Sequence, residues 1–486
     1  MAARSPQARD NVECCFKNCE STSKVLKPGD GRVDVRAFES KAKQAMVVKW
    51  KEGATATFHR SCWAELYKAT QSSSSPISLS DVERSMILDA NKTAEYHDSD
   101  AAISQAAENI VHILQQSSYC IAFTGAGIST AAGIGDYRGI HGKWTEKYKV
   151  KNYGAKGANK PAASKMNGDL QPTYSHEALV KLQDMGLLKF LISQNTDGLH
   201  MLSGIPADKM AELHGNSYVE KCEDCGKRYE RSYPCRQING SFQKRCPRCR
   251  LNHRTGRKCS EPSCNGFLMN TIINFGDFLE SDVIDQARQA AVMSDAVLVL
   301  GSTLMVSPAN VLVTMGKKPA RLIICNRQIT PYDGNCCEVD PDGQPLGSRV
   351  FGDCDNLMKK VMSLLLPPKE LKTWEDGRRA RLMEYGLKRT FVRNDLPVHP
   401  YKASVLTATQ RDKTNAADII DLFVMEQLMN SCSKELYVFL RKRKPADSTE
   451  LVAIAEKYIE THGSAGAFAR NNILTRRTPQ KSRALL

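Results

Sequence analysis

The chain has 486 residues, more than one hydrophobic core usually organises, so we expect a main domain with smaller modules attached. Apolar residues make up 41% of it, but no run of about 18 apolar residues appears and the first ten residues lack an apolar signal segment. We therefore expect a soluble intracellular protein rather than a membrane-spanning or secreted one. The formal net charge of +15 favours acidic partners such as nucleic acid or chromatin.

The N-terminal segment, residues 1–70, contains candidate metal ligands. Cys14, Cys15 and Cys19 lie about 40 residues before His59 and Cys62. Four of these five side chains would suffice for a zinc module, which would be a second zinc site in the chain, and the long gap leaves unrelated thiols as the alternative. A serine-rich stretch follows, and it indicates a linker over residues 71–97.

From residue 98 onwards, helical and strand patterns alternate. Apolar residues at helical spacing predict helices over residues 98–116, 175–185 and 281–291. Short apolar runs predict strands at residues 121–123, 190–193, 296–300 and 322–325. This alternation indicates an α/β fold built on a doubly wound, Rossmann-like parallel sheet.

Three motifs in this domain indicate a catalytic site. Thr-Gly-Ala-Gly-Ile-Ser-Thr at residues 124–130 follows the first strand, and backbone N–H groups at the start of a helix attract a pyrophosphate. Gln-Asn-Thr-Asp-Gly-Leu-His at 194–200 and Leu-His-Gly-Asn at 213–216 add an amide, a carboxylate and an imidazole on loops of the same sheet. Together they predict a dinucleotide-dependent enzyme.

The three motifs resemble those of the sirtuins, NAD-dependent protein deacylases, and the resemblance covers residues 98–366. Further matching segments lie at residues 136–139, 301–304, 306–309, 326–328 and 352–355. Within the family, residues 139–144, the Thr-Gly-Arg before Lys258 and the Gly-Asp-Cys-Asp at 352–355 are similar to the class IV branch, the nuclear chromatin sirtuins.

The resemblance implies a nuclear deacylase that transfers the acyl group of a modified lysine to ADP-ribose and releases nicotinamide, with histones or other chromatin proteins as substrates. His214 would be the general base, since a neutral imidazole is suited to proton transfer near pH 7. Asn195 and Asp197 would grip the nicotinamide carboxamide and complete the catalytic set. Two alternatives stay open: a chromatin or nucleic-acid-binding scaffold with a weakly active sirtuin fold, and a mono-ADP-ribosyltransferase.

The resemblance also implies the cofactor contacts. They are Gly125, Ala126, Gly127, Thr130, Ile134, Asp136, Tyr137, Arg138, Trp144, Gln194, Asn195, Asp197, Gly301, Ser302, Thr303, Asn326, Gln328 and Cys354. Phe275 and Gly276 match the segment that lines the acyl-lysine tunnel. Gly135 departs from the family, because most members have proline there, so ordering the cofactor loop should cost more entropy.

Seven of the 17 cysteines fall between Cys222 and Cys264, which indicates a zinc-binding insert at about residues 218–270. Cys222 and Cys225 supply half of a tetrahedral site. Spacing alone prefers Cys246 and Cys249 for the other half, whereas the family resemblance selects Cys259 and Cys264. We therefore expect one structural Zn²⁺ on Cys222, Cys225, Cys259 and Cys264. The leftover Cys235, Cys246 and Cys249 either lie in an inserted loop or rearrange the site.

Basic residues surround these cysteines between Lys244 and Lys258, and they form either a solvated face or a contact for nucleic-acid phosphates.

Beyond residue 366 the sequence becomes charged and rich in helical patterns. We expect a linker or extension over residues 367–413 and a helical segment over 414–465 that resembles half of a SCAN domain or a retroelement Gag capsid region. Such helices self-associate, and the apolar positions Leu428, Leu436, Phe439 and Leu440 would supply the contact. The basic tail, residues 466–486, is either a nuclear-localisation or nucleic-acid patch or ordinary disorder.

Overall fold

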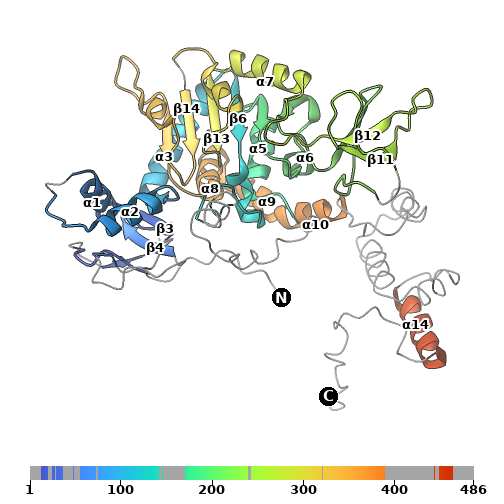
Figure 1. Ribbon diagram of the computed structural model, residues 1–486, viewed down its shortest axis with the longest axis horizontal. Helices are drawn as coiled ribbons and strands as arrows, with labels where there is room; N and C mark the ends of the chain where they lie inside the picture. Colours follow the sequence, from blue (N-terminus) through green and yellow to red (C-terminus); the bar gives the residue numbers. More distant parts are fainter. Residues whose placement is uncertain are drawn as a thin grey trace. The chain divides into compact units, whose positions relative to one another are not determined.

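The computed structural model describes residues 12–19, 24–27, 29–36, 47–48, 55–72, 75–140, 142, 145, 170–238, 242–319, 321–388, 440, 443 and 448–462. The chain divides into two units, Met1–Phe391 and Val392–Leu486. Figure 1 shows the elements of both in sequence colours. Within the described ranges, no helix is long and apolar enough to cross a membrane.

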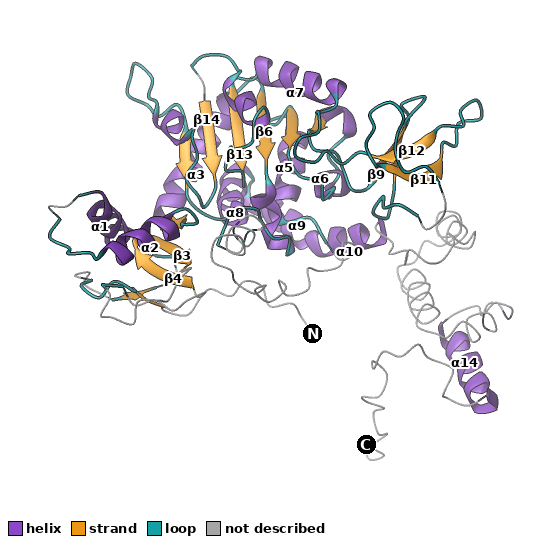
Figure 2. Cartoon of the chain, in the orientation of Figure 1, coloured by secondary structure: helices purple, strands orange, loops and turns teal. Residues whose placement is uncertain are grey.

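A parallel sheet of six strands lies at the centre of the first unit, in the order β8-β7-β6-β13-β14-β15 (Figures 1 and 2). The strands are β6 (Cys120–Thr124), β7 (Phe190–Ser193), β8 (Met210–Glu212), β13 (Ala296–Leu300), β14 (Arg321–Cys325) and β15 (Ser348–Val350). This is the strand order of a doubly wound dinucleotide-binding fold, whose direction reverses between β6 and β13. The predicted fold class is therefore confirmed.

Helices cover both faces of this sheet. On one face, α3 (Asp100–Gln116), α5 (Tyr174–Asp184) and α8 (Cys354–Leu365) share a buried cluster with Ala122 and Leu298. On the other face, α7 (Ser281–Met293) and the 3₁₀-helix η3 (Ala309–Thr314) pack with Ile121 and Val297. Neighbouring strand residues thus point to opposite layers, as the period of two in a strand requires. The predicted helices 98–116, 175–185 and 281–291 correspond to α3, α5 and α7.

Short helices occupy the loops of the sheet. They are the 3₁₀-helices η1 (Ala126–Ala132), η2 (Ala207–Lys209) and η4 (Asp333–Cys337), and the α-helix α6 (Leu199–Ser203). The glycine-rich turn after β6 therefore opens into a 3₁₀-helix.

An antiparallel sheet with the order β10-β9-β12-β11 lies between β8 and α7 along the chain. Its strands are β9 (Val219–Cys222), β10 (Arg228–Glu230), β11 (Arg254–Lys258) and β12 (Phe267–Asn270). It corresponds to the insert expected at residues 218–270.

The N-terminal residues form a module with a core of its own. It contains β1 (Val12–Glu13) paired with β2 (Val25–Leu26), a sheet of β4 (Thr55–His59), β3 (Arg32–Arg36) and β5 (Glu95–His97), and the helices α1 (Arg60–Gln71) and α2 (Asp81–Asn91). Ile87 and Ala90 of α2 are buried in one cluster with Phe58 and Trp63.

The linker expected at residues 71–97 is thus largely part of this module. Two local signals produce the helix there. Ser80 and Glu83 form a capping box, in which the Ser80 side chain accepts from the Glu83 N–H and the Glu83 carboxylate accepts from the Ser80 N–H. The apolar residues Met86, Ile87 and Ala90 then follow at helical spacing and are buried.

Two helices after the catalytic domain pack back on it. They are α9 (Pro368–Asp376) and α10 (Arg378–Lys388). Trp374 meets Tyr174 edge-on, with ring centroids 5.3 Å apart, and Arg378 pairs with the buried Glu177 at 2.6 Å. The extension expected from residue 367 therefore begins as part of the first unit.

In the second unit, the structure describes α14 (Ser448–His462), which lies within the helical segment expected at residues 414–465. Leu440 and Leu451 are buried within this unit. Leu428, Leu436, Phe439 and the basic tail lie outside the described residues.

Candidate functional site

The turns after β6 and β13 meet where the sheet reverses direction. The Gly127 N–H donates to the Gly301 carbonyl at 2.8 Å. A Cβ added at Gly127 would lie 2.6 Å from the Gly301 Cα, and Gly301 has a φ of +67°. Both positions therefore need glycine. The carboxyl ends of parallel strands at such a switch point form the usual ligand crevice of this fold.

The loop after β7 joins this crevice through side chains. Asn195 Nδ2 donates to the Gly125 carbonyl at 3.0 Å, and the Ser129 hydroxyl donates to Asp197 Oδ2 at 2.8 Å. Thr130 caps the same turn by donating to the Gly127 carbonyl at 2.9 Å. The structure thus brings the predicted Asn195 and Asp197 to the glycine turn. Ser129, which was not among the predicted site residues, is the bridge between them.

His214 follows β8 and faces the same loop. Its Nδ1 lies 2.8 Å from the Gln194 carbonyl, which can only accept, so Nδ1 carries the proton and Nε2 keeps its lone pair when the ring is neutral. Burial lowers the pKa of His214 below its ordinary value of 6.5. The imidazole is therefore a neutral base at physiological pH.

His200, in the neighbouring motif, is a core residue. It is 1% exposed, and its Nε2 lies 2.8 Å from the Thr124 hydroxyl. Burial, together with the neighbouring His176, holds the pKa of His200 well below 6.5. Its ring packs on that of His176, with centroids 4.6 Å apart. Of these two motif histidines, His214 has the ring suited to a reacting group.

Gln194 supplies a free donor to the crevice. Its Oε1 accepts from the Ser302 hydroxyl at 3.3 Å. Its Nε2 is buried and has no hydrogen-bond partner among the described residues. A buried donor without a partner is rare in a folded protein, so this N–H is available to a ligand oxygen.

The predicted cofactor loop continues from η1 to Ile140. Ile134 packs with Ala132 and Leu199, whereas Tyr137 is 41% exposed. Burial, and then the charge of Glu95, raises the pKa of Asp136 to about 6. Trp144 lies outside the described residues.

The N-terminal module holds the end of this loop. Glu95 Oε1 accepts from the Ile140 N–H at 2.8 Å, and Arg36 donates to the Ile140 carbonyl at 3.1 Å. Glu95 also pairs with Arg327 at 3.1 Å. Sequence reasoning missed Glu95 and Arg36, because neither belongs to a motif and both lie in a module outside the predicted domain.

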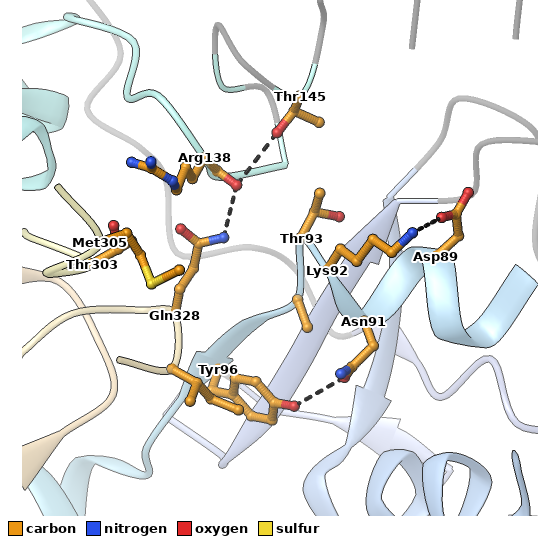
Figure 3. A pocket seen from close by; sticks show the side chains of 12 residues that line it. Asp89, Asn91, Lys92, Thr93, Tyr96, Arg138, Thr145, Thr303, Met305 and Gln328 are labelled. Carbon is orange, nitrogen blue, oxygen red and sulfur yellow. Dashed lines mark hydrogen bonds and ion pairs between the residues drawn. The ribbon is translucent and has the colours of Figure 1, made fainter. Parts of the chain in front are cut away.

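At the end of the site where the adenosine contacts are predicted, a cavity of about 360 Å³ lies between the module and the carboxyl end of the sheet (Figure 3). Thr303 and Gln328 line it from the sheet side, and Lys92 and Tyr96 line it from the module. Gln328 Nε2 donates to the Arg138 carbonyl at 2.7 Å, a contact drawn in Figure 3. The side chain expected to bind a ribose therefore also ties the cofactor loop to β14.

Two other predicted cofactor contacts, Asn326 and Cys354, lie near Gln328. Asn326 is 8% exposed and donates from Nδ2 to the Gln328 carbonyl at 3.0 Å. Cys354, the first residue of α8, is buried next to Cys325. Its backbone, rather than its thiol, is the part that can meet a ligand.

The predicted substrate segment is joined to the His214 loop. The Ile273 N–H donates to the His214 carbonyl at 3.0 Å. Phe275 is 68% exposed, Gly276 has a φ of +95°, and Phe278 is 96% exposed. Phe278, which the sequence analysis did not single out, makes this an exposed aromatic pair beside the base.

The four cysteines predicted as zinc ligands meet in the insert. Cys222 Sγ lies 3.5 Å from Cys264 Sγ, and Cys225 Sγ lies 3.6 Å from Cys259 Sγ. All four sulfurs lie within 4.8 Å of one another, a donor set and spacing that fit a tetrahedral Zn²⁺. Cys235 stands apart from this group.

The N-terminal module holds a second group of this kind. Cys14, Cys19, His59 and Cys62 gather with their ligand atoms within 4.8 Å of one another. Cys19 Sγ lies 3.4 Å from His59 Nδ1 and 3.6 Å from Cys62 Sγ. Cys15 stays outside the group.

Comparison with known proteins supports the reading of these motifs. The model of the Sir2 family matches residues 125–308. "NAD-dependent protein deacetylase" of Saccharolobus solfataricus is 34% identical over 267 residues, which are 53% of this chain and 99% of that protein. "NAD-dependent protein deacetylase SRT1" of Arabidopsis thaliana is 37% identical over 279 residues, 57% of this chain and 53% of that protein.

"NAD-dependent protein deacetylase sirtuin-7" of Homo sapiens is 33% identical over 276 residues, 54% of this chain and 61% of that protein. The chain spans about half the length of the plant relatives it matches.

Proposed function

Because the chain belongs to the Sir2 family, we propose that it is an NAD-dependent protein-lysine deacylase that transfers the acyl group from lysine to ADP-ribose and releases nicotinamide. One observation carries the proposal. A half-buried neutral imidazole, His214, is hydrogen-bonded to the loop that carries Asn195 and Asp197, and this loop is tied to the glycine turn at the switch point of a doubly wound sheet.

The residues of the crevice fit NAD. A Cβ at Gly127 or Gly301 would collide with the backbone of the other turn, so these two glycines let the turns after β6 and β13 meet, and a pyrophosphate would bind to backbone N–H groups there. The partnerless N–H of Gln194 offers a further donor. Asn195 and Asp197 would hold the nicotinamide carboxamide, which needs a donor and an acceptor. NAD supplies the ribosyl carbon that receives the acyl oxygen as nicotinamide leaves.

His214 then acts on a ribose hydroxyl. Its Nδ1 proton is committed to the Gln194 carbonyl, so Nε2 takes the proton from that hydroxyl. The Gln194 carbonyl stabilises the resulting imidazolium. Phe275 and Gly276 would border the acyl-lysine entrance, where an extended peptide can add along the backbone.

We place the chain in the class IV branch and in the nucleus, with acylated histones as substrates. The Gly-x-x-Gly-Lys-Trp motif at residues 139–144 and the relatives named sirtuin-7 support this placement. We also assign one structural Zn²⁺ to Cys222, Cys225, Cys259 and Cys264, and another to Cys14, Cys19, His59 and Cys62.

Fewer basic residues of the insert are available to bind nucleic acid than the sequence analysis suggested. Three of its basic residues between Lys244 and Lys258 are ion-paired, since Arg254 lies 2.6 Å from Glu223, Arg257 lies 2.7 Å from Glu220 and Arg248 lies 3.2 Å from Asp224. The exposed ones that remain for phosphates are Lys244, Arg245, Arg250 and Lys258. A scaffold role would depend on these four, in addition to the tail.

One assay separates the candidate functions: nicotinamide release from NAD, with and without histone peptides that carry acyl groups of several lengths. A deacylase releases nicotinamide and yields the free lysine in equal amounts. Transfer of labelled ADP-ribose to protein without free lysine would identify the mono-ADP-ribosyltransferase instead. Tight nucleic-acid binding with no peptide-dependent release would favour the scaffold and overturn the proposal.

A further inference from the structure

The first zinc half-site of the insert lies on a turn with a defined hydrogen-bond pattern. The Cys222 N–H donates to the carbonyl five residues on, that of Lys227, at 2.9 Å. The Gly226 N–H donates back to the Cys222 carbonyl at 3.2 Å, and Gly226 has a φ of +74°. This turn presents both sulfurs of the Cys-x-x-Cys pair on one side.

The turn at Cys246 repeats this pattern. The Cys246 N–H donates to the carbonyl five residues on, that of Leu251, at 2.9 Å, and the Arg250 N–H donates back to the Cys246 carbonyl at 2.9 Å. Arg250, at the position of Gly226, has a φ of +61°. The second Cys-x-x-Cys pair, Cys246 and Cys249, thus has the backbone of a metal-binding half-site.

The conformation of Arg250 indicates that this geometry is held in place. Arg250 and Leu304 are the non-glycine residues with positive φ among those the structure describes. A left-handed conformation costs a non-glycine residue about 1–2 kcal/mol, so it persists where the surrounding structure favours it. In this turn it keeps the Cys246 and Cys249 sulfurs together.

His253 completes a set of three ligands. Its Nε2 lies 3.0 Å from Cys249 Sγ, and all three ligand atoms lie within 4.8 Å of one another. The backbone of His253 is fixed to β12, because the Asn270 N–H and side-chain amide donate to its carbonyl at 2.9 and 3.1 Å. The imidazole therefore reaches the Cys-x-x-Cys turn from a defined position.

We propose that Cys246, Cys249 and His253 bind a second Zn²⁺ of the insert, separate from the ion on the four cysteines. Two thiolates and an imidazole are ligands that suit zinc and not Mg²⁺ or Ca²⁺. The described residues offer no fourth ligand in this group, so water takes the fourth position, and Cys249 is exposed to solvent. Binding releases the two thiol protons to solvent.

The test counts zinc ions on the full chain by native mass spectrometry under reducing conditions. The zinc count is taken from the folded species alone. Cys249→Ser and His253→Ala should each lose one zinc relative to wild type. Cys259→Ser should lose one, and the double variant Cys249→Ser/Cys259→Ser should lose two. Cys337→Ser is the matched control, since it removes an exposed thiol outside the three metal-type groups.

Two results would overturn the second site. One is a wild-type zinc count in both Cys249→Ser and His253→Ala. The other is a loss of one ion in the double variant, which would mean that the two cysteine sets share a single metal. The His253→Ala variant leaves every thiol in place, so a changed count in it cannot come from a lost disulfide or from thiol oxidation.

Discussion

At the scale of single residues, environment separates side chains that the sequence presents alike. His200 and His214 both lie in family motifs, yet His200 is enclosed by Thr124 and His176, and His214 keeps a free Nε2 at the crevice. The resemblance of its motif to the sirtuins was enough to predict His214 as the base. The tautomer of His214 could not be predicted from the sequence. It is set by the Gln194 carbonyl, and Gln194 and His214 come together only because they follow the neighbouring strands β7 and β8.

His214→Ala should lower deacylation by at least about 100-fold, because a positioned general base contributes that much. NAD binding should stay close to wild type, since the Gln194, Asn195 and glycine contacts are untouched. Single-turnover rates and NAD titration calorimetry measure the two effects. His112→Ala, an exposed histidine on α3, is the control. Near-normal turnover in His214→Ala would exclude it as the base.

The pH profile should follow the depressed pKa of His214. Burial places this pKa below 6.5, so the ring stays neutral and active from alkaline pH down to 6.5. Activity should then fall as the pH drops through the pKa of the folded protein. We expect the acid limb of kcat/KM against pH to have its midpoint below 6.5. A midpoint above 7 would contradict the assignment.

Glu212 should make stability depend on pH. It is half-buried two residues before His214, with the Asn216 amide 2.8 Å away, and the burial of its carboxyl group raises its pKa to about 8. A raised pKa means that the folded state holds a proton that the unfolded state loses above about pH 4.5. Its stability contribution is therefore present at low pH and lost as the pH rises through about 8.

Melting temperatures of wild type and Glu212→Gln, measured from pH 5 to pH 9, check this. The glutamine cannot ionise, so the wild type should lose stability relative to the variant up to about pH 8 and then run parallel to it. Parallel curves over the whole range would show that Glu212 ionises in the folded protein as it does in the unfolded chain.

At the scale of elements, a loop and the module that holds it depend on each other. Gly135 removes a proline restraint from the cofactor loop, and the loop is fixed instead at Ile140 by Glu95 and Arg36. The module thus supplies order that the loop sequence lacks.

Glu95→Ala should raise the KM for NAD by about 5-fold or more, since a lost hydrogen bond to a charged group costs upward of about 1 kcal/mol. Glu95→Gln should have a smaller effect, because its amide oxygen can still accept from Ile140. Steady-state kinetics at saturating peptide give the KM. Glu65→Ala, an exposed acid on α1, is the matched control. An unchanged KM in Glu95→Ala would show that the N-terminal module does not order the cofactor loop.

The strands and the zinc ligands show which parts of the structure could be predicted from the sequence. Strands β6, β7, β13 and β14 match the predicted ones within a residue, because each is a fully or largely buried apolar run of four or five residues. Strands β8 and β15 have three residues each, too few for a pattern to be read. The zinc pair Cys259 and Cys264 came from the family resemblance, since spacing alone favoured Cys246 and Cys249.

At the scale of the whole molecule, the catalytic unit is longer than the family match. Arg378 and Arg381 pair with the buried Glu177 of α5 at 2.6 and 3.1 Å, and Tyr385 is 5% exposed beside α6. Removing everything after residue 366 would leave Glu177 buried without its cations, which is strongly destabilising. A deletion that isolates the catalytic unit should therefore start after α10.

Deleting residues 392–486 should reduce self-association and keep catalysis. The Gag-like resemblance and the apolar positions Leu428, Leu436 and Phe439 motivate this, since apolar helical faces are usually buried between chains when nothing else covers them. No residue of the proposed active site lies in the second unit. Light scattering of the deleted protein should show fewer chains per particle than the full chain, with equal deacylation per active site.

A double substitution, Leu436→Glu with Phe439→Glu, tests the same contact in the full chain, because buried charges at an interface are costly. It should give the smaller particle without any change in length, and a charge-matched pair in the tail, Thr478→Glu with Ser482→Glu, is its control. Particles that keep the same number of chains in both the deletion and the double variant would show that these helices do not join the molecules. Lost peptide deacylation in the deleted protein would instead show that the second unit supports the catalytic fold.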